Sequence, residues 1–259
     1  MKPYDTVKAA RLQNRASASD FIENIFNSFV QLHGDRRFKD DKAVIGGIAM
    51  LDNFPVTVVG ILKGKDLKQR LTSNFGCANP EGYRKALRLF KQAEKFDRPV
   101  ICFIDTPGAY PGIGAEERGQ GQAIAENITE MMSLKVPSIS IIIGEGGSGG
   151  ALALAVSDEV WMLENSIYSV ISPEGCASIL WKDSTKVKEA AESLKLTAKD
   201  LLALGVIEKI FDENMPLEKL CDNIKTSLIK VISKNKLISK EELLNNRYEK
   251  FRKIGRENI

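Results

Sequence analysis

The sequence predicts an α/β fold with a largely parallel sheet. Short apolar runs alternate with segments of helical periodicity after residue 79, and the connections between them are short. The 259 residues, 43% of them hydrophobic, are enough to bury a substantial core. We expect an N-terminal helical segment at residues 1–40, a core at 41–212 and a C-terminal helical extension at 213–259.

The first elements are expected to be a helix and a hairpin. Apolar side chains recur at helical spacing over residues 19–32, after a serine or aspartate that suits the helix cap. Two β-type runs follow, residues 44–51 and 55–62. Asp52-Asn53 between them is typical of a tight turn, so the two runs predict a hairpin.

The rest of the core alternates strands and helices. Asparagine at a cap and proline in the first turn predict that Asn79-Pro80 begins a helix running to about residue 96. The chain is expected to be mostly helical after residue 180. The elements expected in between are a strand at 100–104, a loop at 105–114, a helix at 115–134, a strand at 138–143, and short strands at 160–163 and 168–171.

The most informative segment is the glycine run, residues 144–150, which has five glycines in seven positions between a buried strand and a helix start. Glycine is costly in backbone entropy, so such a run indicates close approach of the backbone to something. Besides simple helix–strand packing, three interpretations compete. They are a nucleophile elbow around Ser148, a dinucleotide fingerprint with Glu164 as its acidic ribose ligand, and an oxyanion hole made of backbone donors.

The single histidine disfavours the hydrolase interpretation. His33 lies far upstream of Ser148, whereas the catalytic histidine of that fold follows the serine. A lysine that takes the proton of Ser148 in place of a histidine stays an alternative. His33 ends the predicted helix at residues 19–32 and precedes a glycine, so we expect it to cap that helix rather than to catalyse.

A second loop follows the preceding strand. This proline-glycine loop, residues 105–112, should leave the same sheet edge as the glycine run, because ligands of open α/β sheets bind outside the carboxyl ends of the strands. One N–H from each loop could then bind one oxygen, as in a two-donor oxyanion hole. We expect Asp105 to organise the loop by accepting nearby N–H groups.

Composition excludes several other classes of function. The net charge of +3, without a basic and aromatic stripe, gives no reason to expect nucleic-acid binding. The four cysteines form no C-x-x-C pair, so no zinc site is predicted, and they are expected to be reduced thiols of a cytoplasmic protein. No signal peptide or membrane span is recognised.

Five long segments, residues 32–51, 75–99, 103–128, 136–183 and 245–255, closely resemble the carboxyltransferase α subunit of bacterial acetyl-CoA carboxylase. The resemblance covers nearly the whole chain. It implies a crotonase-type fold, a spiral of β-β-α units with added helices. It also implies a transferase of fatty acid synthesis that moves carboxylate from carboxybiotin, carried on a biotin carboxyl carrier protein, to acetyl-CoA, and so forms malonyl-CoA.

The resemblance further implies partners but no covalently bound cofactor and no metal. The chain would pair with a β subunit as an α2β2 assembly, and biotin carboxylase would belong to the larger complex. The biotin ureido group can itself take the methyl proton of acetyl-CoA, which would explain why no histidine base is needed. Another biotin-dependent acyl-CoA carboxylase or decarboxylase stays an alternative, because the acyl pocket would lie mostly on the β subunit.

Site residues follow from the resemblance by position. The donors of an oxyanion hole for the ureido oxygen would be the N–H groups around Gly108 and Ala109, with Gly149 and Gly150. Glu145, Glu116, Glu117 and Arg118 could order the loops by ion pairs. The binding loops would include Pro107, Tyr110, Gly146, Gly147 and Ser148.

The sequence departs from the family in three places. An N-terminal helical segment of family members is absent before residue 3, residues 11–17 lack the proline-rich family version, and Asn214-Met215-Pro216 replaces a glycine-rich turn. None of these touches the two loops, so we expect a competent enzyme subunit. Which of Lys63, Lys65, Arg84 and Arg118 meets biotin or CoA is left open.

Overall fold

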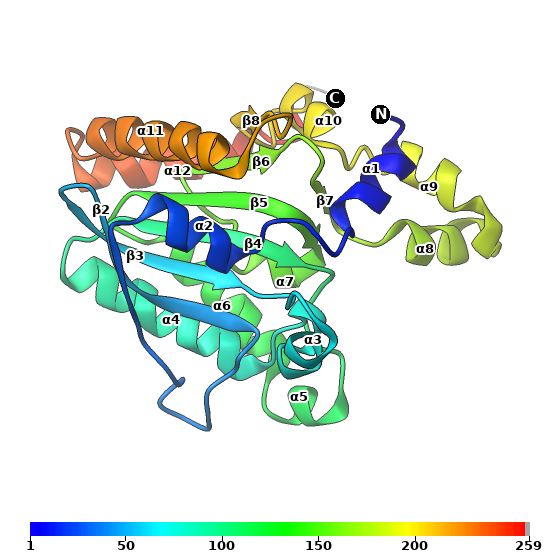
Figure 1. Ribbon diagram of the computed structural model, residues 1–259, viewed down its shortest axis with the longest axis horizontal. Coiled ribbons are helices and arrows are strands. Elements are labelled where there is room, and N and C mark those ends of the chain that lie inside the picture. Colours follow the sequence, from blue (N-terminus) through cyan, green and yellow to red (C-terminus); the bar gives the residue numbers. More distant parts are fainter. Residues whose placement is uncertain (257–259) are drawn as a thin grey trace.

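The computed structural model describes residues 1–256 and has one eight-stranded sheet (Figure 1). The strand order is β1-β2-β3-β4-β5-β6-β8, and β7 pairs with the end of β5. From β3 onward every pairing is parallel, which confirms the predicted α/β fold. The strands are β1 (Ser28–Gln31), β2 (Val44–Leu51), β3 (Phe54–Ile61), β4 (Val100–Thr106), β5 (Ser138–Gly147), β6 (Glu159–Leu163), β7 (Ile167–Ser169) and β8 (Lys209–Phe211).

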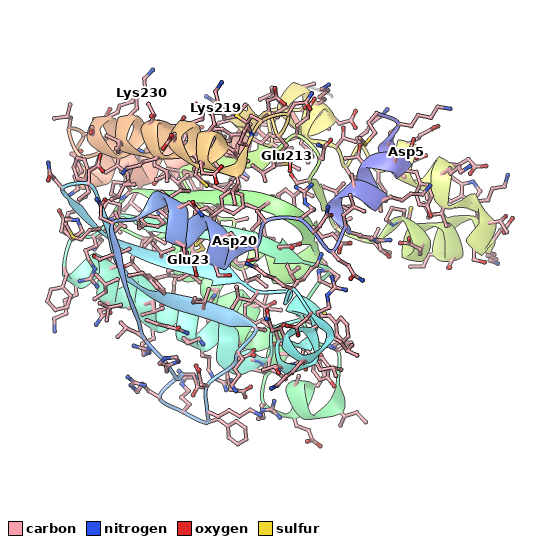
Figure 2. The ribbon with its side chains drawn as sticks, viewed as in Figure 1. Asp5, Asp20, Glu23, Glu213, Lys219 and Lys230 are labelled. Atoms are coloured by element: carbon pink, nitrogen blue, oxygen red, sulfur yellow. The ribbon has the colours of Figure 1, made fainter. Side chains whose placement is uncertain are left out.

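Helices cover both faces of the sheet. Helices α2 (Ala18–Ile25) and α11 (Leu217–Asn235) pack on one face, and α4 (Pro80–Lys95) and α6 (Gln120–Met132) on the other, each pair around its own apolar cluster (Figure 1). Figure 2 shows Lys219 and Lys230 on the outer side of α11. The other helices are α1 (Pro3–Ala10), α3 (Leu67–Thr72), α5 (Ile113–Glu117), α7 (Ser148–Leu152), α8 (Pro173–Cys176), α9 (Val187–Ser193), α10 (Ala198–Ala203) and α12 (Lys240–Lys253), with short 3-10 or π turns at Asn74–Gly76, Ala177–Trp181 and Ser184–Lys186.

The hairpin and the long helix after residue 79 are confirmed. Strands β2 and β3 pair antiparallel through a turn in which Asp52 has a φ of +50°. Helix α4 begins at Pro80 as predicted, although the Asn79 side chain makes no capping bond. The strands predicted at 100–104 and 160–163 are present as β4 and β6, and the one predicted at 168–171 is the shorter β7.

The predicted helix at residues 19–32 is wrong in its second half. Helix α2 ends at Ile25, and residues 28–31 form the edge strand β1, which pairs antiparallel with β2. Phe29 and Val30 fit the spacing of a helix and the alternation of a strand equally well, and pairing with the hairpin decides the outcome. His33 therefore caps no helix. It is exposed, and its Nδ1 lies 3.1 Å from Asp40 Oδ2.

Two other boundaries differ from the expectation. The helix predicted at 115–134 is divided into α5 and α6 at Gly119, whose φ of +81° only glycine adopts easily. The strand predicted at 138–143 continues to Gly147, because Gly146 pairs with both β4 and β7. The glycine run is therefore a strand end followed at once by the first turn of α7, and no separate loop lies between them.

Asp40 anchors residues 34–41 against α4 and gives a pH-dependent prediction. Burial alone would raise its pKa, but hydrogen bonds from the Lys85 ammonium and the Gly34 N–H lower the pKa from 3.8 to about 2. Because the folded state favours the ionised form, this stabilisation is present above pH ~4 and is lost as the pH falls towards 2. We expect Asp40→Asn to lower the urea midpoint at pH 7, with the deficit shrinking below pH ~4. A deficit that does not change with pH would contradict this assignment.

Cys77, Cys102, Cys176 and Cys221 are free thiols, in agreement with the prediction of unpaired cysteines. Within residues 1–256, no helix has the length and apolar character that crossing a bilayer would require.

The division of the chain into an N-terminal segment, a core and a C-terminal extension at residues 40 and 212 stays a prediction. Helix α11, beyond that second boundary, shares one apolar cluster with α2.

Candidate functional site: two strand ends with unbonded backbone donors

The two segments singled out in the sequence leave the sheet side by side. Strands β4 and β5 are parallel neighbours, and Thr106 pairs with Gly146 beyond an irregularity in the register. The proline-glycine loop and the glycine run therefore meet at one carboxyl edge, as expected for an open α/β sheet.

Close contacts explain two of the glycines in the run. A Cβ on Gly147 would collide with the carbonyl of Pro107. A Cβ on Gly150 would lie 2.6 Å from the Ala109 nitrogen and 2.8 Å from the Tyr83 hydroxyl, where no side chain fits. The two segments touch through their backbones, and this contact requires glycine.

Gly146 and Gly149 have different surroundings. A Cβ on Gly146 would stand 3.0 Å from the ring of Tyr168, its partner in β7. At Gly149 the nearest atom would be a methyl of Ile124 at 3.5 Å, which is ordinary van der Waals contact. The contacts within the chain therefore do not require glycine at position 149.

Ser148 stands at the sharp turn from β5 into α7. Its φ is +51°, an uncommon value for a residue with a side chain, and the residue is exposed. This strand–turn–helix geometry is the one that a nucleophile elbow uses. His33, the only histidine, bonds to Asp40, so no histidine is available to take a proton from Ser148.

Three backbone N–H groups at this edge are unbonded. Within residues 1–256, no acceptor is hydrogen-bonded to the N–H of Ala109, Gly149 or Gly150. The N–H of Gly108, which was also expected to be a free donor, instead donates to Thr106 Oγ1 at 3.0 Å. Gly108 contributes a backbone φ of +148° that favours glycine.

A cluster of charges surrounds the buried carboxylates of Asp105 and Glu145 at the same two strand ends. The Lys63 ammonium lies 2.8 Å from Asp105 Oδ1 and 2.6 Å from Glu145 Oε2, and Arg11 Nε lies 2.7 Å from the other oxygen of Glu145. Burial alone would raise the pKa of Glu145, but Lys63 and Arg11 hold it below its usual value. Asp105 also accepts the Glu145 N–H at 2.8 Å, so it joins its segment to the neighbouring strand instead of bonding N–H groups of its own loop as predicted.

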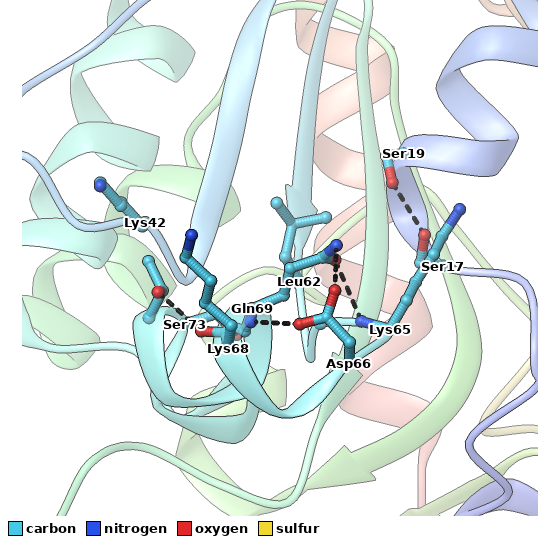
Figure 3. A pocket seen from close by; sticks show the side chains of 11 residues that line it. Ser17, Ser19, Lys42, Leu62, Lys65, Asp66, Lys68, Gln69 and Ser73 are labelled. Carbon is cyan, nitrogen blue, oxygen red and sulfur yellow. Dashed lines mark hydrogen bonds between the residues drawn. The ribbon is translucent and has the colours of Figure 1, made fainter.

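The four basic residues left open by the sequence all have acidic partners within the chain. Lys63 binds the carboxylates just described, Arg84 binds Asp35 and Glu81, Arg118 binds Glu81 and not Glu116 or Glu117, and Lys65 binds Asp20. Lys65 stands at a polar cavity of about 590 Å³ that follows β3 and is lined also by Lys42, Lys68 and Ser17 (Figure 3).

An apolar cavity of about 380 Å³ begins at the glycine run. Ser148 and Gly149 form its polar end. The remaining wall comes from α7, β6, β7, α10, the residue after α9 and the end of α12, and it includes Leu152, Tyr168, Leu201, Val206, Phe251 and Ile254. Such a cavity suits a ligand that is largely neutral and carries one polar group towards the donors.

Several contributors to the site carry no local signal in the sequence. Tyr83 and Gln120 act through tertiary contacts that no spacing pattern reports. Thr106 acts locally, because its hydroxyl accepts the N–H of Gly108 two residues later. Glu164, which the dinucleotide interpretation needs as a ribose ligand, instead lies 3.1 Å from the ammonium of Lys199.

The family model for acetyl co-enzyme A carboxylase carboxyltransferase-like proteins matches residues 1–255. The chain is 61% identical to an acetyl-coenzyme A carboxylase carboxyl transferase subunit alpha of Ruminiclostridium cellulolyticum, over 98% of both chains. It is 56% identical to a protein of Natranaerobius thermophilus described as subunits beta/alpha, matching 99% of this chain and 43% of that one. A solved transcarboxylase 12S chain superposes with a TM-score of 0.72 at 17% identity, over 90% of this chain and 45% of that one. This likeness confirms the crotonase-type fold.

Proposed function

Because this chain belongs to the acetyl-CoA carboxylase carboxyltransferase family, as an α subunit, we propose that it transfers carboxylate from carboxybiotin to acetyl-CoA together with a β subunit. The observation that carries the proposal is the trio of unbonded N–H groups on Ala109, Gly149 and Gly150 where two strands end side by side. Backbone donors held in place suit an oxygen on which negative charge develops.

We propose specific roles for the residues at this edge. The N–H groups of Ala109, Gly149 and Gly150 donate to the ureido oxygen of biotin, which becomes negative when the carboxyl group leaves. Gly108 provides the backbone turn that places Ala109, since its own N–H is bonded to Thr106. Pro107, Gly146 and Gly147 hold the two segments together, and Tyr110 and Ser148 border the ligand.

The apolar cavity supports a biotin ligand. It starts beside the Gly149 N–H and is walled by aliphatic and aromatic side chains. The rings and valeryl chain of biotin are neutral and mostly apolar, so they match such a wall, and the ureido oxygen matches the donors at its end. Carboxybiotin reaches the site as a group on its carrier protein, so no resident cofactor is needed.

The proposed partners follow from the family. Some relatives carry both subunits in one chain and are described as subunits beta/alpha. We propose that a β subunit supplies most of the acetyl-CoA site in an α2β2 assembly. The biotin carboxyl carrier protein and biotin carboxylase complete the system in the cytoplasm.

Substitution of Ser148 distinguishes catalysis by backbone donors from catalysis by a serine nucleophile. We expect Ser148→Ala to keep carboxyl transfer within about threefold of wild type, because the donors are main-chain groups. Loss of a nucleophile would instead cost several orders of magnitude. Steady-state rates of the assembled complex measure the difference, and a loss above ~10³-fold would favour a covalent serine mechanism.

The substrate assignment is tested by comparing acetyl-, propionyl- and butyryl-CoA as acceptors with the assembled complex. The proposal predicts the highest kcat/KM for acetyl-CoA. A clear preference for a longer acyl group would replace acetyl-CoA by that substrate and would favour another biotin-dependent carboxylase. Decarboxylation of malonyl-CoA without transfer to biotin would favour the decarboxylase alternative.

A further inference from the structure

A buried glutamine holds the proline-glycine loop in place. Gln120, the first residue of α6, is 3% exposed. Its side-chain Nε2 donates to the carbonyl of Ala78 at 2.9 Å and to the carbonyl of Tyr110 at 2.8 Å. Both partners are acceptors, so the orientation of the amide group is fixed by its surroundings.

Hydrogen bonds from Gln120 on one side and Thr106 on the other fix the backbone around Ala109. The Tyr110 N–H donates to Ala78 at 3.0 Å, so both polar groups of the Tyr110 backbone are held. On the other side, Thr106 Oγ1 accepts the Gly108 N–H and donates to the Gly108 carbonyl at 2.9 Å. Ala109 stands between two fixed residues, and its own N–H is left without a partner in residues 1–256.

Gln120 is itself set on a rigid frame. Gly119 before it has a left-handed backbone, and Arg118 binds the fully buried Glu81 of α4 with an Nε–Oε1 distance of 2.6 Å. Arg84, also on α4, donates to the Arg118 carbonyl at 2.9 Å. Ion pairs and hydrogen bonds therefore tie the start of α6 to the start of α4, which is the kind of support that a precise site requires.

We propose that Gln120 is a positioning residue that directs the Ala109 N–H towards the developing charge on the substrate oxygen. The inference rests on the proposed function and deepens it. Gln120 Oε1 is buried without a hydrogen-bond partner, a feature that works against stability and that a purely structural side chain at this position would not need. A carboxamide at this position supplies the two hydrogen bonds that it donates to the carbonyls of Ala78 and Tyr110.

The test compares Gln120→Met with a matched control, Gln122→Met, in the complex assembled with the β subunit. Methionine keeps the shape of glutamine, removes both donors and also removes the unpartnered acceptor. We expect kcat for biocytin carboxylation from malonyl-CoA to fall about 10–100-fold, since small misplacements cost rates of this order. We expect KM for biocytin and the melting temperature to change little. Gln122 is exposed and, in the described part of the chain, its side chain bonds only to Glu126, so its variant should match wild type.

A second variant, Gln120→Glu, adds a pH readout. Its buried carboxyl group can donate to a carbonyl only when it is protonated, so its kcat relative to wild type should rise as the pH falls. A wild-type kcat in Gln120→Met would overturn the inference. It would also be overturned if the activity of both Gln120 variants fell only in proportion to the amount of folded, assembled complex. An inactive wild-type complex would instead count against the proposed function itself.

Discussion

Replacing Gly150 by alanine is expected to lower kcat/KM for carboxyl transfer by about 10²–10³-fold, the range found when one oxyanion-hole donor is removed. The added Cβ would lie 2.6 Å from the Ala109 nitrogen and 2.9 Å from the Gly108 carbonyl carbon, so the two segments must separate. That separation moves two of the three unbonded donors relative to each other. The reaction of malonyl-CoA with biocytin, catalysed by the assembled complex, measures the loss.

Gly121→Ala is the matched control for this substitution. Gly121 lies in α6, and a Cβ there would meet nothing within 4 Å. Alanine is also the better helix former by up to about 1 kcal/mol, so this variant should be as active as wild type and slightly more stable. Full activity of Gly150→Ala in an intact complex would show that contact between the two segments is not needed for catalysis.

Replacing Arg247 by methionine is expected to destabilise the chain by about 3–5 kcal/mol, as when one partner of a buried ion pair is removed. The guanidinium is fully buried and lies 2.8 Å from Asp158 Oδ1. It also donates to the carbonyls of Met131 and Leu134 at 2.8 and 2.7 Å, which closes the end of α6. The variant leaves the Asp158 carboxylate and these carbonyls without their partner.

Urea unfolding of the isolated chain measures this effect, with Arg252→Met as the control. Arg252 lies on the same helix but is exposed, and its guanidinium lies over the ring of Tyr248. Its loss should change the free energy of unfolding by less than about 0.5 kcal/mol. If both variants unfold at the same urea concentration, the contacts of Arg247 do not anchor α12 to the core.

Patterns of neighbouring residues were sufficient to predict the elements whose turns and helix starts have characteristic residues. The turn at Asp52, the start of α4 at Pro80 and the glycine run after an apolar strand identify the hairpin, the long helix and one side of the site. These features depend on neighbours in the sequence, and turn and cap chemistry act at that range. The resemblance then supplied the family and the crotonase-type fold.

Other features depend on pairing across the molecule and could not be predicted. Residues 28–31 become a strand only because β2 offers an open edge. One local feature was also missed: the hydroxyl of Thr106, two residues before Gly108, accepts the Gly108 N–H and leaves Ala109 as the donor on that side. The support from Gln120 joins residues 78, 110 and 120, and no spacing in the chain relates these three positions.

We propose that the active site is shared between this chain and a β subunit. The most direct measurement is release of acetyl-CoA from malonyl-CoA with free biocytin as the carboxyl acceptor, run with this chain alone, with the β subunit alone and with both. A shared active site requires turnover only in the mixture. Turnover by this chain alone, or none in a mixture that demonstrably assembles, would contradict it.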